Sequence, residues 1–243
     1  MSRSLSDPVS CLADPVSGAV RAAAAAGIGQ DRRNVGCGLE FLAALPEASV
    51  ACAVFDPQYR GVMDRLAYGN EGARQKGRAR LAQMPEATIG AFLSAIARVV
   101  RPRGHLFLWV DKFHLVQGVR PWLAPAGLEA VDMVTWDKGR IGMGYRTRRR
   151  SEYLVVAQKP PLRAKGVWTR RDIPDVVTEK VPRAGHAHRK PVELQASLIE
   201  AVTDPGDLVI DPAAGSFSVL ESCARLGGRV FLGTDLADHA ASS

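Results

Sequence analysis

The sequence has few aromatic residues, few cysteines and no hydrophobic run long enough to cross a membrane. Aromatic residues make up 6% of its 243 positions. The four cysteines, Cys11, Cys37, Cys52 and Cys223, form no Cys-x-x-Cys pair, which argues against a disulfide framework and a zinc site. No apolar stretch approaches the roughly 20 residues that span a bilayer. The N-terminal residues also lack a basic segment followed by an apolar core, so we do not expect secretion. We therefore expect a cytoplasmic protein with neither a metal nor a membrane partner.

The length and composition indicate one main domain. With 47% hydrophobic residues, a chain of 243 residues can bury one sizeable core. Residues 1–30 repeat the tetrapeptide Asp-Pro-Val-Ser and contain an alanine run. Such a segment can bury little surface, so we expect either a poorly ordered arm or one short helix. The main domain is expected to cover residues 31–243.

Positive charge is concentrated in one section of the chain. Residues 138–190 contain 15 Lys and Arg against 4 Asp and Glu, whereas the whole chain carries 32 against 25. The remainder is therefore slightly negative. A near-neutral body with one basic section is typical of a protein that binds nucleic acid. A solvated basic loop explains the charge equally well.

Apolar runs and amphipathic segments alternate along the chain, which predicts a doubly wound α/β fold with a mostly parallel sheet. Residues 159–185 are basic, contain proline and have little periodicity, so we expect a small lobe or loop outside the sheet. The predicted strands are residues 50–55, 105–110, 128–136, 152–158, 208–210 and 230–232, and the predicted helices are residues 39–45, 87–100, 115–123, 190–202 and 217–226.

Two Asp-Pro pairs follow predicted strands. Asp56 and Pro57 come directly after residues 50–55, and Asp211 comes at the end of residues 208–210. In open α/β sheets, ligands bind just beyond the carboxyl ends of the strands. We therefore expect both pairs to face one cleft.

The second of these turns is suited to holding a nucleoside. Gly215 would let the backbone approach a ligand, and Asp235, at the end of the next strand, could accept hydrogen bonds from both ribose hydroxyls. The turn lacks the Gly-x-Gly-x-x-Gly pattern, so a pyrophosphate cofactor is not favoured. An ordinary βαβ turn would look the same.

The first turn is suited to holding an amine. The carboxylate of Asp56 and the carbonyl of Pro57 offer two acceptors for the two N–H groups of an exocyclic amine, and Tyr59 offers a ring on which a base could stack. A base can reach such a site only after leaving the duplex stack. Taken alone, Asp-Pro-x-Tyr is a common turn.

Together and in order, these segments resemble the β class of S-adenosylmethionine-dependent amino-methyltransferases that act on DNA. The resemblance covers roughly residues 34–236 and implies a Rossmann-like class I methyltransferase fold in circularly permuted order, with the catalytic half first. The matching blocks are residues 39–59, with Asp-Pro-Gln-Tyr in place of Asp-Pro-Pro-Tyr, and residues 98–107, 136–154, 186–194, 211–217 and 233–235.

The resemblance also implies roles for individual residues. Those expected to hold the target amine are Asp56, Pro57 and Tyr59. Those expected to hold S-adenosylmethionine are Asp211, Ala213, Gly215, Ser216, Asp235, Lys190 and His186. Gln58 stands where the class usually has a second proline, and Cys37 stands where an acid often contacts the adenine of the cofactor.

The basic section falls where this class carries its target-recognition segment, which we place at residues 159–185. Cationic side chains there would contact phosphates of double-stranded DNA, and only a few would read bases. A homodimer is implied by the resemblance alone. The residues expected to contact DNA are Arg140, Arg146, Arg148, Arg149, Arg150, Lys165, Arg170 and Arg171.

The predicted function is site-specific methylation of the N6 amine of adenine in DNA, because cytosine-N4 enzymes of this class more often have serine at the position of Asp56. Two alternatives stay open. One is a cytosine-N4 DNA methyltransferase. The other is a DNA-binding protein on a methyltransferase scaffold that no longer catalyses, for which Gln58 and Cys37 are the arguments.

Overall fold

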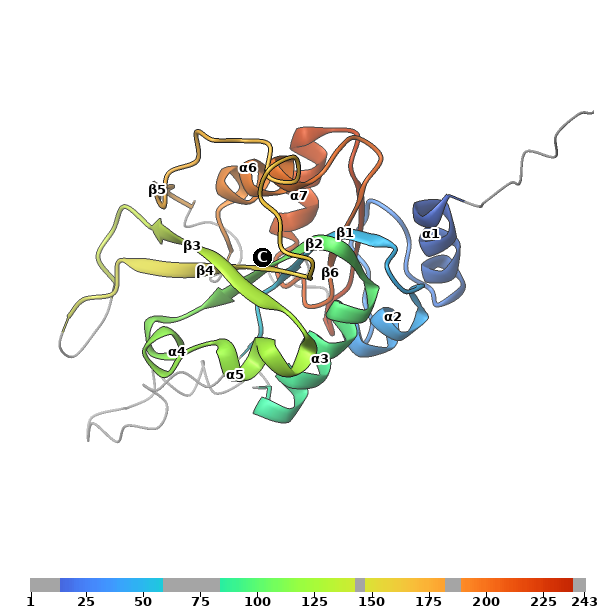
Figure 1. The fold of residues 1–243 in the computed structure, drawn as a ribbon, viewed down its shortest axis with the longest axis horizontal. Helices are drawn as coiled ribbons and strands as arrows, with labels where there is room; N and C mark the ends of the chain where they lie inside the picture. Colours follow the sequence, from blue (N-terminus) through green and yellow to red (C-terminus); the bar gives the residue numbers. More distant parts are fainter. Residues whose placement is uncertain (1–13, 59–83, 143–146, 182–188, 238–243) are drawn as a thin grey trace, which may run out of the picture.

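The computed structural model describes residues 14–58, 84–142, 147–181 and 189–237. Within them, one seven-stranded sheet runs in the order β5-β3-β4-β2-β1-β6-β7 (Figure 1). Only β4 is antiparallel to its neighbours, so the predicted doubly wound, mostly parallel sheet is confirmed. The strands are β1 (Val50–Phe55), β2 (Val100–Val110), β3 (Glu129–Asp137), β4 (Ser151–Gln158), β5 (Val176–Thr178), β6 (Leu208–Asp211) and β7 (Val230–Gly233).

Helices cover both faces of this sheet. The helices α2 and α3 pack on one face together with α5, and α6 and α7 pack on the other, as Figure 1 shows. The helix predicted at residues 115–123 is instead two short ones, because Gly118 between them has a φ of +85°, which ends a right-handed helix. The helices are α1 (Pro15–Ala25), α2 (Gly38–Ala44), α3 (Glu86–Val99), α4 (Lys112–Gln117), α5 (Arg120–Leu123), α6 (Val192–Val202) and α7 (Ser218–Leu226), with a 3-10 turn at Ala124–Ala126.

The central strand β1 is buried along its whole length. Its side chains alternate between the two hydrophobic clusters: Ala53 and Phe55 face α2 and α3, whereas Cys52 and Val54 face α6 and α7. Phe55 stacks on Phe92 of α3 with ring centroids 5.1 Å apart. A strand covered on both faces reads as a continuous apolar run, which is why its bounds could be predicted. By the same alternation, the residue after Phe55 lies on the α6 face.

Part of the N-terminal segment is helical and packed. Asp14 caps α1 by accepting hydrogen bonds from the N–H groups of Val16 and Ser17, and Ala19 and Ala23 are fully buried against the domain. Of the two forms expected for residues 1–30, the described part therefore has the helix. The alanine run supplies both helix propensity and small side chains for close packing.

The segment that follows α1 extends the sheet. The carboxylate of Asp31 accepts a hydrogen bond from the N–H of Phe231 at 2.8 Å, and the amide of Asn34 donates to the carbonyl of Gly233 at 2.9 Å. Val35 and Asp235 form a parallel bridge. Residues 31–36 thus lie along the outer edge of β7, so the first residues of the main domain are hydrogen-bonded to its last strand.

Residues 159–175, called here the crossing segment, run over the α6 face of the sheet. The segment starts after Gln158, which pairs with His105 in the middle of β2. It ends at β5, which pairs with the last residues of β3. Trp168 and Ile173 pack against the cluster under α6. The region predicted as a lobe outside the sheet therefore contributes to the core along this path.

Candidate active site

The parallel strands β1, β2, β6 and β7 end at one edge of the sheet, called here the carboxyl edge. Because β6 lies between β1 and β7, this edge brings Asp56, Asp211 and Asp235 together. Asp211 is 5% exposed, and burial raises its pKa well above the ordinary value, with further contributions from the negative charges of Asp56 and Asp235. Converging carboxylates of this kind favour a cationic ligand.

The turn after β6 leaves backbone open to that ligand. The N–H of Ala213 donates to the Asp211 carboxylate at 3.2 Å, and the N–H of Gly215 donates to the Asp235 carboxylate at 2.8 Å. Gly215 has a φ of +50°, and a Cβ added there would meet nothing within 4 Å. A ligand can therefore approach the main chain closely at this position.

The end of the same turn is strained and held from outside. Phe217 has a φ of +60°, a left-handed conformation that costs a non-glycine residue about 1 kcal/mol or more. Its ring is buried, and the guanidinium of Arg33 lies 5.1 Å from the ring centroid while donating to the carbonyl of Ser216 at 3.2 Å. The packing of Phe217 thus fixes a conformation that local preference opposes.

A buried lysine links the end of β1 to the start of β4. The ammonium of Lys190 lies 2.9 Å from a carboxylate oxygen of Asp56 and 2.9 Å from one of Glu152. It also lies 5.1 Å from the ring centroid of Trp109. The other oxygen of Glu152 accepts a hydrogen bond from Lys138 at the end of β3. Charges of alternating sign therefore run across the carboxyl edge on the α6 face.

The surroundings keep this network ionised. Burial alone would raise the pKa of Glu152, but the positive charges of Lys190 and Lys138 outweigh it and lower that pKa to about 2. Burial alone would lower the pKa of Lys190, but Asp56 and Glu152 outweigh it and raise that pKa. All of these side chains except that of Asp56 are less than one third exposed, so the charges are screened only in part by solvent.

Comparison with known proteins identifies the family. A family model described as DNA methylase matches residues 157–242. The chain is also 53% identical over 208 residues to the type II methyltransferase M.HhaII of Haemophilus parahaemolyticus, which covers 85% of this chain and 91% of that protein. The chain belongs to the N6/N4 DNA methylase family. It is a DNA methyltransferase that uses S-adenosylmethionine.

Solved methyltransferase structures share the fold. The complex of M1.HpyAVI with S-adenosylmethionine has a TM-score of 0.61 at 18% identity, covering 85% of this chain and 93% of that one. The PvuII DNA methyltransferase, titled cytosine-N4-specific, has a TM-score of 0.66 at 15% identity, covering 84% and 81%. At these identities the likeness establishes a common architecture, and the resemblance stated from sequence is confirmed at the level of family and fold.

The residues of this methyltransferase fit its cofactor. S-adenosylmethionine carries a positive sulfonium and an ammonium group, and the carboxylates of Asp56, Asp211 and Asp235 meet at one edge with the open backbone of Gly215 between strands. The structure also places Ala213 and Ser216 in this turn. Among the residues expected to act at the site, Tyr59 and His186 lie outside the described residues.

The structure gives Lys190 and Glu152 contacts that the sequence does not predict. Lys190 was expected beside the cofactor, and the structure pairs its ammonium with Asp56. The sequence predicts no role at the site for Glu152, Trp109 or Lys138. A signal was available for Glu152, because it precedes Leu154 and Val156 on the buried face of β4, and an acid on such a face needs a partner.

The residues predicted to bind DNA fall into two groups. Arg140, Arg148, Arg149 and Arg150 lie between β3 and β4, at the carboxyl edge; Arg146 lies outside the described residues. Arg140 and Arg148 are exposed, whereas Arg150 forms two hydrogen bonds of 2.7 Å with Asp137. The structure therefore places this group at the same edge of the sheet as Asp56.

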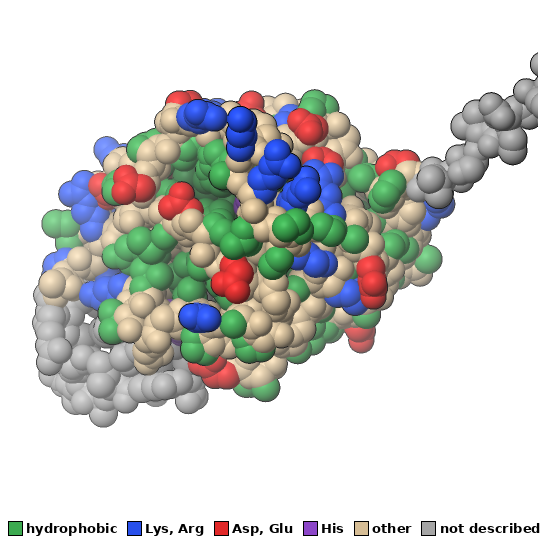
Figure 2. All heavy atoms as spheres, in the orientation of Figure 1, with side chains coloured by type: hydrophobic (Ala, Val, Ile, Leu, Met, Phe, Trp, Pro, Cys, Tyr) green, Lys and Arg blue, Asp and Glu red, His purple; other side chains and the backbone are tan. Residues whose placement is uncertain are grey.

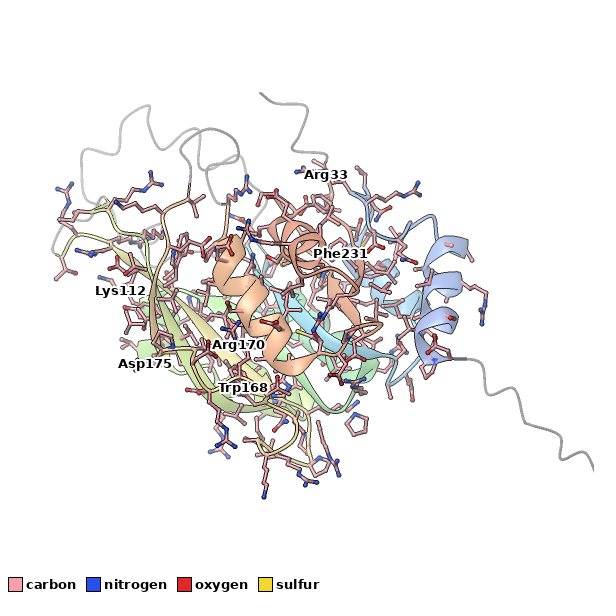
Figure 3. All side chains as sticks on the ribbon, turned by 90° about the horizontal axis from the view of Figure 1, so that it is seen from above. Arg33, Lys112, Trp168, Arg170, Asp175 and Phe231 are labelled. Atoms are coloured by element: carbon pink, nitrogen blue, oxygen red, sulfur yellow. The ribbon has the colours of Figure 1, made fainter. Side chains whose placement is uncertain are left out.

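The second group lies at the opposite edge of the sheet. Lys165, Arg170 and Arg171 belong to the crossing segment, where Arg170 pairs with Asp172 at 2.5 Å and with Glu200 near the end of α6 at 2.7 Å. Figure 3 shows Arg170 and Trp168 far from Arg33, which donates a hydrogen bond to Ser216 in the turn after β6. On the face in Figure 2, several Lys and Arg side chains form a row across the upper middle, and the others are scattered with Asp and Glu among them. The basic section is thus divided between two places.

Two further features are absent from the described part of the chain. No group of three or more His, Cys, Asp or Glu side chains there could hold a metal ion. No helix there is long and apolar enough to span a membrane.

Proposed function

We propose that this methyltransferase methylates the N6 amine of adenine at a specific site in double-stranded DNA. The observation that carries the proposal is the position of Asp56, a carboxylate at the end of β1, beside the turn that suits the cofactor and paired with Lys190. A carboxylate accepts a hydrogen bond from the amine and helps direct the nitrogen lone pair toward an electrophile. Serine is more frequent here in the cytosine-N4 enzymes of the class.

The turn after β6 and the residues at the end of β1 then have different proposed roles. Asp211, Ala213, Gly215, Ser216 and Asp235 hold S-adenosylmethionine, with Asp235 accepting from the ribose hydroxyls and Asp211 compensating positive charge. When bound, the cofactor supplies the electrophilic methyl group. Lys190 serves the catalytic side through Asp56, and we carry forward the prediction that His186 lies near the cofactor.

The target base must leave the duplex to reach Asp56. Extrusion of a base costs a few kcal/mol, which contacts in the pocket and along the backbone must offset. Pro57 is buried directly after Asp56, which fixes the path of the chain where its carbonyl is proposed to accept the second N–H of the amine. Tyr59 is proposed to stack on the extruded base.

Cytosine N4 is the second candidate target. A solved structure titled cytosine-N4-specific has the same fold, with a TM-score of 0.66, so the fold does not separate the two bases. Both reactions methylate an exocyclic amine. Only the identity of the methylated nucleoside distinguishes them.

The test combines product analysis with one variant. Purified protein is incubated with S-adenosylmethionine and unmethylated DNA of diverse sequence, and the digested nucleosides are quantified by mass spectrometry. We expect N6-methyladenine from the wild type and none from Asp56→Ala, which should still bind the cofactor in calorimetry. Detection of N4-methylcytosine would show that cytosine, and not adenine, is the target base. Full turnover by Asp56→Ala would show that Asp56 has no catalytic role.

Two assembly features are part of the proposal. The described arginines between β3 and β4 are proposed to contact DNA phosphates, because they lie on the same edge as Asp56. For Arg146 the same role is proposed from the sequence alone. A homodimer is proposed from the class that the chain resembles. Light scattering at several protein concentrations, with and without DNA, measures the mass that tests it.

A further inference from the structure

We propose that Glu152 is a positioning residue for methyl transfer, which acts by sharing the Lys190 ammonium with Asp56. This inference rests on the proposed catalytic role of Asp56. The ion pairs described for the Glu152 carboxylate are with Lys138 and Lys190. Its effect on the reaction would therefore pass through Lys190.

The geometry fixes the ammonium from three sides. The Nζ atom of Lys190 lies 2.9 Å from Asp56 and 2.9 Å from Glu152, and the face of Trp109 lies 5.1 Å away. Trp109 is 1% exposed and packs edge-on against Trp136 with centroids 5.9 Å apart. The lysine side chain itself is 13% exposed. An ammonium enclosed in this way has a defined position, and so has the carboxylate that it contacts.

The charges explain why a second acid is needed. Lys138, Glu152, Lys190 and Asp56 alternate in sign, so the row as a whole is neutral. If Glu152 were neutral, Lys190 would direct its charge toward Asp56 alone. Asp56 would then be a weaker acceptor for the target amine, since a carboxylate already engaged by an undivided cation attracts a further N–H less strongly. Glu152 thus preserves the accepting strength of Asp56.

Glu152 reaches this position through the fold. It is the second residue of β4, which is antiparallel to β2, so Tyr153 pairs with Val110 at the end of β2. Antiparallel pairing therefore places the start of β4 at the carboxyl edge, where the parallel strands end. Lys190 comes from the residues that precede α6. Four segments therefore supply the four charges, namely the ends of β1 and β3, the start of β4 and the residues before α6. A purely parallel sheet would not assemble them in this way.

The experiment compares charge removal at two acids. Glu152→Gln removes the charge with little change of shape. Glu193→Gln is the matched control, because Glu193 forms an exposed pair with Arg225 at 2.6 Å. Single-turnover transfer of labelled methyl to saturating DNA gives the rate of the chemical step, and calorimetry gives the dissociation constant for S-adenosylmethionine.

We expect Glu152→Gln to slow single-turnover transfer about tenfold or more, the size of losing one hydrogen bond to a charged group. The dissociation constant for the cofactor should stay within about twofold, because the cofactor turn is untouched. Glu152→Asp, which keeps the charge, should recover part of the rate. Glu193→Gln should match the wild type. A wild-type rate in Glu152→Gln, or a rate loss matched by lost cofactor affinity, would overturn the proposal.

A double variant tests whether the effect passes through Lys190. If it does, Lys190→Gln and Lys190→Gln with Glu152→Gln should be equally slow, because the second change has nothing left to act on. Multiplying losses would overturn the proposal. Thermal melting shows whether each variant is folded, and Glu152→Asp serves if Glu152→Gln is not. Turnover by Asp56→Ala would refute the catalytic role of Asp56, on which this inference rests, whereas an inactive Asp56→Ala beside a fully active Glu152→Gln would refute only this inference.

Discussion

Asp56 and Asp211 lie at the ends of neighbouring strands, but among the described residues only the charge of Asp56 is balanced by a nearby cation. The side chain of Asp56 is 34% exposed and pairs with Lys190. Asp211 is buried, and its carboxylate accepts a hydrogen bond from the neutral N–H of Ala213. Its raised pKa means that the ionised carboxylate is costly in the protein without cofactor. Affinity for a cation and reduced stability therefore have the same cause at this residue.

The first prediction concerns Asp211→Asn. Because the folded protein holds the Asp211 proton more tightly than the unfolded chain does, the stability that this group contributes is present at low pH and is lost as the pH rises through the raised pKa. The variant cannot suffer this loss. Without cofactor, its melting temperature should exceed that of the wild type by a few degrees at pH 8, and the difference should shrink toward pH 5.

The same substitution should weaken cofactor binding. Calorimetry at pH 8 should show a dissociation constant for S-adenosylmethionine raised about tenfold or more, because a compensating charge is lost. The stability gain and the affinity loss must occur together if Asp211 has the proposed role. An equal melting temperature at all pH values would contradict the burial of an uncompensated charge.

At the scale of elements, the turn between β6 and α7 gives the second prediction. Gly215 and Gly227, at the two ends of this unit, have φ values of +50° and +66°, and an added Cβ would meet nothing within 4 Å at either. Substitution by alanine should therefore cost each about 1 kcal/mol of stability through backbone strain alone. Gly215→Ala should also weaken cofactor binding, because its Cβ would occupy space beside the open backbone.

Gly227→Ala is the matched control for strain. With a φ of +66° and a ψ of +158°, Gly227 has a conformation that is essentially restricted to glycine. Gly227→Ala should therefore lose at least as much stability as Gly215→Ala, and it should bind S-adenosylmethionine as the wild type does. Equal cofactor affinities in the two variants would show that the ligand does not approach the main chain at Gly215. Denaturant unfolding and calorimetry on the same preparations measure both quantities.

How far the sequence predicts these elements depends on whether their cause is local. The sequence predicts the bounds of β1 and of the unit from β6 to β7 within a residue or two. A buried strand needs a short apolar run, and the turn that follows it needs a glycine or a proline. The crossing segment could not be predicted, since its path depends on Trp168 packing across the sheet. The pairing of Lys190 with Asp56 and Glu152 also depends on tertiary contacts between distant segments.

At the scale of the whole molecule, the two edges of the sheet separate two groups of arginines. Arg140 is exposed at the carboxyl edge, whereas Arg170 is tied to Asp172 and Glu200 at the other. Each substitution by alanine removes one positive charge. If DNA lies along the carboxyl edge, only Arg140→Ala should weaken DNA binding and reduce the slope of log affinity against log salt by about one.

Arg170→Ala should behave differently. It should leave the salt slope unchanged and lower the melting temperature slightly, because partly exposed ion pairs contribute little. Fluorescence anisotropy over a series of salt concentrations measures both slopes. Equal slopes for the two variants would place DNA across both edges and would restore the crossing segment as a DNA-binding surface.

The bridge between Val35 and Asp235 has a consequence for how the protein is made. β1 carries Asp56 and is synthesised early, but it lies between β2 and β6, so one of its edges stays unpaired until β6 has left the ribosome. Asp235 comes later still. A nascent chain can thus hold every residue proposed to bind the target base while lacking a finished cofactor pocket. Newly made protein should therefore acquire cofactor binding only in the last step of its folding, when the two ends of the domain meet.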